Sequence, residues 1–508
     1  MQRISLIILA MGILYSMSSC VSDLQDIENI KVDFGEQEFA VPLVNSTLSI
    51  RDALDNFDTG GVLLEDENNF MTLVYKGKVF ETTGIESVSI PDFGFPVIDT
   101  TVIVPFGGAG TEFDFDYINI KNGNLKVSAQ SDITEDLIVS LQIQNLVIDQ
   151  EPTEVTFQMD YNNNSPTINE VSTILSQHFL DLSNKEIAVS YTAVNAAGQR
   201  FRLDQLTVEF QDLEPSAIQG YFGKQSFAQQ SDSIVIDIFK DIAVGKILMK
   251  EPKIRFIVEN NIGIPTELKS EIFLATNSQG ETMNFNSVLD QGVQVDYPAI
   301  AKVDEVKTTI IQFDNTNSNL EQLINSNPEK IVYSMAAAIN PNEDNSIRGI
   351  MTDASKVNVD LELELPVWLS AENFTIEETS DVDVSIFDDV VEAEFKLIAE
   401  NGLPIETAIQ LYFEDDSGVV LDSLLNLENN FIQAAQVNAS GEVTQINREE
   451  QFVKMDQFRI NNISKATKIR TKSVFSTSDA SNVASKFYTD YQISFLLGVR
   501  AIIKTEEE

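Results

Sequence analysis

Carboxylates are the most abundant chemically active groups in this sequence, and four of them lie close together. Asp381 and Asp383 alternate on a predicted strand and so share one face, and Asp388 and Asp389 follow at the next turn. Oxygen ligands that converge at loops are what calcium prefers. The spacing matches no EF-hand loop, so these aspartates predict either a calcium site or a solvated acidic surface.

Other candidate catalytic groups are few. Asp114 and Asp116 form a second carboxylate pair, and a pair of acids is what a polysaccharide-processing enzyme requires. Sugar sites usually add aromatic platforms, but Trp368 is the only tryptophan. His178 is the only histidine, and the HExxH and GxSxG motifs are absent, which disfavours zinc-protease and serine-hydrolase chemistry. Gly107–Gly110 lacks the lysine of a P-loop and is predicted to be a plain loop.

The remaining reactive group is Cys20, the only cysteine in the chain. Arg3 supplies positive charge, residues 4–15 are uncharged and mostly apolar, and small residues precede the cysteine, which is typical of a secretory signal. The apolar run is too short for a spanning helix. A cysteine at the cleavage point resembles a bacterial lipobox, which implies lipidation of Cys20 and a membrane anchor. The alternative is an ordinary signal peptide with an incidental cysteine.

The residues after Cys20 bear on the destination of the protein. The residue after the cysteine is Val21. An aspartate at this position would favour retention of a lipoprotein in the inner membrane, so the valine argues against that location. The acidic stretch with Asp23, Asp26 and Glu28 resembles the signal that directs Bacteroidota lipoproteins to the outside of the outer membrane. A flexible acidic tether is the alternative interpretation of the same residues.

Charge restricts the partners of the chain. Its 508 residues include 79 acidic and 33 basic side chains, for a net charge of −46. Such a surface is repelled by phosphate backbones and anionic head groups, which excludes nucleic acid and leaves the lipid as the means of holding a membrane. The remaining partners are a protein or a glycan at the cell surface. Apolar residues make up 43%, enough for packed cores without disulfide bonds.

The apolar periodicity indicates strands almost throughout. Period-two segments separated by turn residues predict a mainly β fold of tandem antiparallel β-sandwich modules with a few short helices. Asn122–Gly123 lies between two alternating segments and predicts a hairpin. Ser49 and Asp52 form a capping box before one short helix, and residues 320–324 form another that stops at Asn327-Pro328.

A repeat organises the second half of the chain. Residues 233–241 match residues 381–389, and Ile254–Asn260 matches Phe395–Asn401. A proline follows each asparagine, which predicts a strand, a turn and an antiparallel return strand. Residues 137–152 form a weaker third copy around Asn145. This strand–Asn–Pro–strand unit resembles the β-sandwich of late-embryogenesis-abundant and water-stress domains.

The wider pattern resembles large β-rich outer-membrane lipoproteins of Bacteroidota. The segments that carry this resemblance are residues 220–223 (GYFG), 317–320 (NSNL) and 491–501, the last with one apolar face. The resemblance implies fold and location, without an activity or site residues. The expected division is a lipoprotein signal peptide at 1–19, an acidic tether at 20–35, a β-rich domain at 36–212 and β-sandwich domains at 213–365 and 366–508.

The sequence therefore predicts a lipid-anchored cell-envelope protein on the outer membrane, facing the cell exterior. Its expected role is that of a structural or partner-binding module without catalysis. Two alternatives stay open: a polysaccharide-processing enzyme that uses a carboxylate pair, and a carrier of a hydrophobic ligand. The enzyme requires two acids in a groove, and the carrier requires an apolar cavity inside a sandwich.

Overall fold

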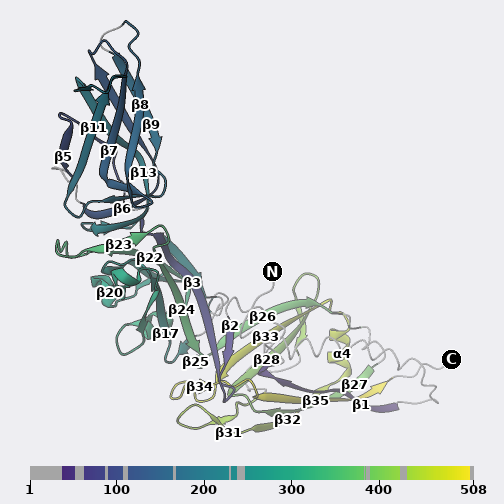
Figure 1. Cartoon of the computed structure of the whole chain (residues 1–508). Coiled ribbons are helices and arrows are strands. Elements are labelled where there is room, and N and C mark those ends of the chain that lie inside the picture. The colour runs from purple at the N-terminus through teal and green to yellow at the C-terminus, as the bar shows by residue number, and fades with distance from the viewer. Residues whose placement is uncertain are drawn as a thin grey trace.

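The chain folds into an elongated series of β bodies, here called the upper sandwich, the middle sandwich and the lower body (Figure 1). The computed structural model describes residues 37–51, 62–85, 88, 90–106, 113–163, 167–227, 230–236, 239, 246–382, 384, 390–423 and 432–503. Its sheets are antiparallel, and the α-helices described over their whole length are α3 (Leu320–Ile324) and α4 (Gln457–Ile463). The prediction of a mainly β fold is confirmed, as is the short helix at 320–324.

The upper sandwich consists of two sheet layers joined at one side. β8, β7, β11 and β5 form one layer and β9, β6, β13 and β4 the other, while β10 pairs with both β6 and β7. The layers pack through alternate residues: Val139 and Leu141 of β7 are fully buried, as is Val127 of β6. The strands are β4 (Phe93–Pro96), β5 (Thr101–Pro105), β6 (Asp114–Ser131), β7 (Leu137–Ile148), β8 (Glu151–Met159), β9 (Thr167–Ile174), β10 (His178–Asp181), β11 (Glu186–Val194), β12 (Arg200–Phe201) and β13 (Gln205–Tyr221).

The middle sandwich packs two sheets around aromatic side chains. One sheet has the order β2-β3-β24-β17-β21, and the other centres on β22 and β18. Phe256 and Phe273 meet edge to face between the sheets, and Tyr333 is fully buried beside them. The strands are β2 (Val62–Glu65), β3 (Met71–Thr83), β14 (Gln225–Ser226), β15 (Gln230–Val235), β17 (Lys253–Asn260), β18 (Thr266–Asn277), β19 (Thr282–Asn284), β20 (Val293–Val295), β21 (Lys307–Phe313), β22 (Pro328–Ile339) and β24 (Lys356–Pro366), with 3-10 helices η4 (Val288–Gln291) and η5 (Ile300–Lys302). β23 (Gly349–Thr352) comes between β22 and β24 in the chain but joins the sheet of the upper sandwich by pairing with β13.

The lower body joins the two ends of the described chain. β1 pairs with β35, which in turn pairs with β27, and a second sheet has the order β26-β33-β28-β29. A small sheet, β16-β25-β34, lies where the lower body meets the middle sandwich. The strands are β1 (Gln37–Ser49), β16 (Lys246–Met249), β25 (Trp368–Glu372), β26 (Phe374–Asp381), β27 (Val390–Asn401), β28 (Ile405–Glu414), β29 (Val420–Ser423), β30 (Gln436–Val437), β31 (Val443–Gln445), β32 (Asn447–Met455), β33 (Lys468–Thr477), β34 (Ser485–Lys486) and β35 (Gln492–Ile503).

Strand pairing divides the chain differently from the boundaries expected at 36–212, 213–365 and 366–508. β1 pairs with the last strand of the chain, and β3 pairs with β24 in the middle sandwich. β1, β2 and β3 therefore belong to the later bodies, and the chain leaves them to form the upper sandwich between β4 and β13. Periodicity marks strands but carries no information on long-range pairing, which explains the difference.

The turn that the sequence predicted after each repeated asparagine is a crossing from one sheet to another. β17 and β18 lie in opposite sheets of the middle sandwich, and β27 and β28 in different sheets of the lower body. Asn260 is fully buried, accepts from Ile262 N at 2.9 Å and donates to the Asp296 carbonyl at 3.0 Å. Asn401 is equally buried and likewise accepts from Leu403 N at 2.9 Å. Each side chain therefore fixes a corner of a sandwich.

The weaker third copy behaves differently. β7 and β8 form a hairpin within one sheet, and Asn145 lies in a bulge between them. Its side chain donates to the carbonyl oxygens of Asp181 and Glu186 and accepts from Ala188 N at 3.1 Å. The asparagine thus joins β7 to the β10–β11 region and does not turn a corner.

The predicted hairpin at Asn122–Gly123 is wrong. β6 runs through both residues, and β13 pairs with it on either side of a bulge between Gln211 and Glu214. A Cβ at Gly123 would lie 2.7 Å from Leu213 Cδ2, so glycine here allows the bulged strand to approach closely. The long pairing of β6 and β13 overrides the local turn signal. Ile50 and Arg51, inside the capping box predicted at Ser49 and Asp52, are helical, and residues 52–61 lie outside the described residues.

A different motif forms four of the hairpin turns, namely Asn or Asp followed three residues later by glycine. In one of them Asn195 Oδ1 accepts from Ala197 N and Gln199 N, and Gly198 has a φ of +80°. Glycine takes this left-handed conformation without a Cβ clash. The same side-chain bonds and φ values of +78° to +81° recur at Asn277–Gly280, Asp415–Gly418 and Asn438–Gly441.

Candidate functional site

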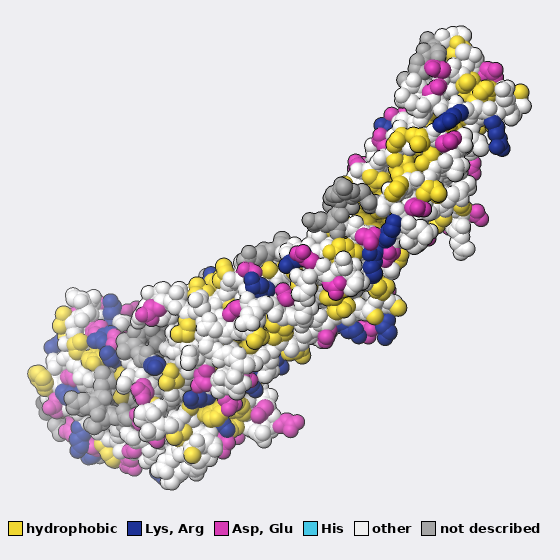
Figure 2. Space-filling model, turned by 90° about the vertical axis from the view of Figure 1, so that its left-hand side faces the viewer, with side chains coloured by type: hydrophobic (Ala, Val, Ile, Leu, Met, Phe, Trp, Pro, Cys, Tyr) yellow, Lys and Arg dark blue, Asp and Glu magenta, His cyan; other side chains and the backbone are white. Residues whose placement is uncertain are grey.

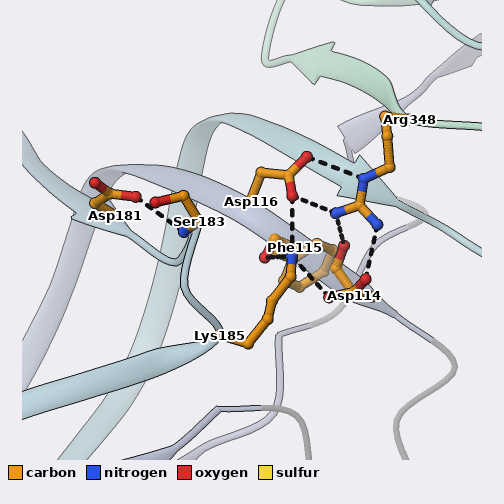
Figure 3. Close-up of polar contacts among 7 residues, drawn as sticks. All are labelled: Asp114, Phe115, Asp116, Asp181, Ser183, Lys185 and Arg348. Carbon is orange, nitrogen blue, oxygen red and sulfur yellow. Dashed lines mark hydrogen bonds and ion pairs between the residues drawn. The ribbon is translucent and has the colours of Figure 1, made fainter.

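The carboxylate pair Asp114 and Asp116 lies on β6, where the upper sandwich meets the middle sandwich, and both are paired with cations (Figure 3). Lys185 Nζ is 2.8 Å from Asp114 Oδ1 and 2.9 Å from Asp116 Oδ1. Arg348 Nη1 is 2.7 Å from Asp114 Oδ2, and its Nε is 3.0 Å from Asp116 Oδ2. We call these four residues the junction cluster.

Lys185 is positioned by the turn between β10 and β11. Ser183 N donates to Asp181 Oδ1 at 2.9 Å, which starts the turn (Figure 3). Leu182 then bonds in both directions: its N–H donates to the Asp116 carbonyl and its carbonyl accepts from Lys185 N, each at 2.8 Å. Lys185 itself has a φ of +57°, and the turn so formed directs its ammonium onto the carboxylates.

Arg348 is positioned by β23, which links two bodies through its backbone. One edge of β23 pairs with β13, and on the other edge Ile350 exchanges backbone hydrogen bonds with Gly263 of the middle sandwich. A Cβ at Gly220 of β13 would lie 2.5 Å from the Asp114 carbonyl oxygen, so only glycine permits this approach. That same carbonyl accepts from Arg348 Nη2 at 2.6 Å. Backbone and side chains therefore bind the junction together.

Both aspartates of the cluster are held ionised. Burial acts to raise the pKa of Asp114, but the hydrogen bonds from Lys185 and Arg348 outweigh it and bring the pKa below its usual value. The pKa of Asp116 is lowered in the same way, against the opposing effect of burial, by Arg348 and then Lys185. Burial would lower the pKa of Arg348, yet its bonds to Asp116 and Asp114 raise it.

The junction cluster is thus built for attachment and not for acid–base chemistry. A glycosidase pair needs one carboxyl group that keeps its proton near the working pH, which requires a raised pKa. Here two anions face two cations, and the charges are internally balanced. Sequence reasoning flagged Asp114 and Asp116 by their spacing, but Lys185 and Arg348, at separations of 69 and 232 residues from Asp116, were missed because only the fold brings them near.

The four aspartates proposed for calcium are only partly described. Asp381 ends β26, opposite Lys468 of β33. Asp383, Asp388 and Asp389 lie outside the described residues, so a shared site is not tested. Within the described part of the chain, no three or more His, Cys, Asp or Glu side chains are grouped so as to hold a metal ion.

The single histidine and the single tryptophan both have local structural roles. His178 is buried at the start of β10, with Nδ1 2.9 Å from the Ser176 carbonyl oxygen. Trp368 donates from Nε1 to the Ala484 carbonyl at 3.0 Å, and Lys486 Nζ lies 4.9 Å from its ring centre. The glycine run at 107–110 lies outside the described residues.

An aromatic cluster near Trp368 is a feature that sequence reasoning missed. Tyr488 contacts Phe70 and Tyr491, with ring centres 5.5 and 5.2 Å apart. The rings tilt against one another and Tyr491 Oη accepts from Val443 N, so the cluster packs the region between the middle sandwich and the lower body. Its members come from the residue just before β3 and from the segment before β35, and no local spacing relates them.

The interior of the upper sandwich bears on the carrier interpretation. Large side chains from both layers fill it, and Phe210, Ile118, Leu125 and Leu141 are fully buried or nearly so. A hydrophobic ligand would have to displace this core. Among the described residues, no helix has both the length and the apolar character needed to cross a bilayer.

No protein-family model and no curated protein matches this chain. Among solved structures, it is similar to a candidate secreted protein of Parabacteroides distasonis, with 11% identity, coverage of 92% of this chain and 99% of that chain, and a TM-score of 0.27. It is also similar to the particle protein of infectious bursal virus (7% identity, 79% and 72% coverage, TM-score 0.15). A third is the tandem CBM22 region of Paenibacillus barcinonensis Xyn10C (9% identity, 62% and 91% coverage, TM-score 0.14). Similarities at these TM-scores carry no conclusion about this chain.

Proposed function

We propose that this chain is a lipid-anchored protein of the cell envelope, acylated at Cys20 and displayed on the outer face of the outer membrane. Its role is to hold a binding module away from the membrane, without catalysis. The sequence around Cys20 supports the anchor, and the acidic residues that follow support export to the surface. Cys20 and the tether lie outside the described residues.

The observation that carries this proposal is the position of β1. β1 is the described strand nearest to Cys20, and it pairs with β35 in the lower body. Gln37 follows Cys20 by seventeen residues, which span about 60 Å at most when fully extended. The upper sandwich lies at the opposite end of the molecule (Figure 1). An anchor at Cys20 therefore keeps the lower body near the membrane and leaves the upper sandwich farthest from it.

The junction between upper and middle sandwiches supports a role in presentation. β23 pairs on both edges, and the junction cluster adds ion pairs between the bodies. Lys121 of β6 makes one more, with Nζ 2.9 Å from Asp353 Oδ2. A connection of this kind resists bending, which is what a spacer requires. The balanced charges at Asp114 and Asp116 leave that pair unsuited to catalysis.

Protease treatment of intact cells tests the proposal, with the native protein compared with Cys20→Ala. We expect the native protein to fractionate with the outer membrane and to be digested on whole cells. We expect Cys20→Ala to be released from the membrane fraction. If the native protein is protected on intact cells, the proposed surface display is wrong. If Cys20→Ala fractionates like the native protein, the anchor is wrong.

A further inference from the structure

Two arginines of the upper sandwich lack the partner that every other described arginine has. Nine arginines fall within the described residues. Seven of them make an ion pair with a carboxylate: Arg51, Arg255, Arg348, Arg448, Arg459, Arg470 and Arg500. Arg200 and Arg202 make none with any described carboxylate, although acidic side chains outnumber basic ones 79 to 33. Both are exposed, and Arg202 donates to the Ile98 carbonyl.

The two arginines lie at the border of a sheet face whose side chains are mostly uncharged. Arg200 pairs with Val194 of β11, which pairs with Ile138 of β7 and then Gln158 of β8. The inward residues of these strands are buried, so the alternate residues form the outer face. That face, here called the upper face, presents Thr101, Ile103, Ile138, Ser140, Gln142, Gln144, Thr156, Gln158, Ala188, Ser190, Thr192, Val194, Arg200 and Arg202. Its acidic members are Glu154 and Glu186, together with Asp160 just after β8, whose Oδ1 accepts from Gln158 Nε2 at 2.6 Å.

The surface of the whole molecule makes this composition unusual. The chain carries a net charge of −46. On the side of the molecule that carries β5, acidic side chains are spread along its whole length, the upper sandwich included, and a broad group of apolar side chains lies on the upper sandwich (Figure 2). One acid of the upper face is already bonded, since Ser140 donates to Glu154 and also lies 2.9 Å from the Thr156 hydroxyl.

The chemistry of the upper face points to one class of ligand. Hydroxyl and amide side chains in adjacent rows can form hydrogen bonds with the hydroxyl groups of a sugar chain lying across the strands. Thr192, Ser140 and Thr156 stand side by side in one such row. The described residues of this face include no aromatic ring on which a neutral sugar could stack. A free guanidinium instead binds carboxylates, in a bidentate manner.

We infer that the upper face binds a linear polysaccharide that carries carboxylate groups, with Arg200 and Arg202 as the residues that select the charge. A protein partner fits less well, since a stable interface buries about 800 Å² per partner around an apolar centre. Here the exposed Ile103 and Ile138 lie on strands separated by β11. Repulsion of the polymer by distant acids is screened beyond about 8 Å at physiological salt.

This inference rests on the proposed display of the upper sandwich, but its test does not depend on lipidation. The full chain with Cys20→Ala is titrated with polygalacturonate, alginate and chondroitin sulfate in a calorimeter. Fully methyl-esterified polygalacturonate supplies the same sugar chain without charge, and poly-L-glutamate supplies carboxylates without sugar. We expect at least one acidic polysaccharide to bind and both control polymers to bind at least tenfold more weakly.

Variants locate the site. The double change Arg200→Ala/Arg202→Ala is expected to weaken binding at least tenfold, and Gln142→Ala severalfold. Arg448→Ala is the matched control, because Arg448 is exposed and already paired with Glu400. It is expected to leave binding unchanged, and thermal melting checks that each variant is folded.

Three results would overturn the inference. The first is that none of the three acidic polysaccharides binds. The second is that poly-L-glutamate binds as tightly as the acidic polysaccharides, which would mean that the face recognises carboxylate charge without the sugar. The third is that the double variant binds like the parent chain. None of these results bears on the anchor at Cys20, which is tested on cells.

Discussion

The guanidinium of Arg348 lies against the carboxylate of Asp116, 232 residues earlier in the chain, with Nε 3.0 Å from Oδ2. Asp116 belongs to the upper sandwich, and Arg348 lies just before β23, on the segment that arrives from β22 of the middle sandwich. The pair therefore ties two bodies by their side chains, beside the backbone pairing of β13 with β23. The stability of the junction should depend on it.

Replacement of Arg348 by alanine should loosen the junction. Asp114 and Asp116 would keep only Lys185, and two anions would be left with one cation. Because the cluster is partly exposed, we expect a loss of about 1–2 kcal/mol in the free energy of unfolding. Calorimetry measures the loss, and limited proteolysis should cleave sooner between the upper and middle sandwiches. Arg448→Ala, which removes the exposed pair with Glu400, should cost less than about 0.5 kcal/mol; an equal cost for both variants would contradict this account.

Acid should weaken the same junction. The pKa values of Asp114 and Asp116 are lowered in the folded protein, while an unfolded aspartate titrates near a pKa of about 3.9. Groups with lowered pKa values contribute stability that is fully present above about pH 4 and is lost as the pH falls through their folded pKa values. The stability difference between the parent chain and Arg348→Ala should therefore shrink as the pH falls from about 5 to below 3. The other carboxylates titrate in both proteins, so their contribution drops out of the difference. A difference that stays constant over that pH range would exclude the ionised aspartates as the source of the stability.

The sequence predicted the parts of the structure that depend on local pattern. The strand with Ile493 on its apolar face appears as β35, and the helix at 320–324 appears with the expected limits. What it did not predict are relationships between distant segments. Asn122–Gly123 carries a strong turn signal, yet the long pairing of β6 with β13 outweighs it. The crossing at Asn260 also depends on which sheet receives the next strand, and two asparagines followed by prolines do not contain that information.

The candidate site shows the same limit. Asp114 and Asp116 were found because their spacing places them on one face of a strand. Their partners Lys185 and Arg348 come from a turn and from another body, so spacing could not relate them. The upper face was missed for a different reason: its residues are individually ordinary, and only the pairing of β5, β7, β8 and β11 brings them together.

Gly77 in β3 should not tolerate a side chain. A Cβ there would lie 2.5 Å from the Tyr333 hydroxyl oxygen and 3.3 Å from Ile234 Cγ1. Tyr333 is fully buried and cannot swing away, and burial raises its pKa to about 12. Gly77→Ala should thus cost about 1–3 kcal/mol through overpacking, measured by chemical unfolding. The double variant Gly77→Ala/Tyr333→Phe removes the clashing oxygen and should recover most of the loss. If it is as unstable as Gly77→Ala alone, the clash is not the cause.

The buried corner asparagines should be among the most sensitive positions of the lower and middle bodies. Asn401 donates to the carbonyl oxygens of Ile405 and Gln433, each at 2.8 Å, and accepts from Leu403 N. Asn401→Ala leaves these three backbone groups without a hydrogen-bond partner in the interior, where each unpaired polar group costs about 1–3 kcal/mol. We expect a total loss of about 2–4 kcal/mol, and a similar loss for Asn260→Ala, both measured by chemical unfolding.

Asn401→Asp separates the hydrogen bond that Asn401 accepts from the two that it donates. The aspartate keeps an oxygen to accept from Leu403 N but cannot donate to Ile405 or Gln433, and it places a charge in a buried site. It should therefore be at least as destabilising as alanine, and its loss should ease at low pH, where the protonated carboxyl group donates one hydrogen bond. Asn145→Ala is the control, because Asn145 is only half-buried and lies within a single sheet, and it should cost less. If Asn145→Ala costs as much as Asn401→Ala, the corner is not what makes these asparagines necessary.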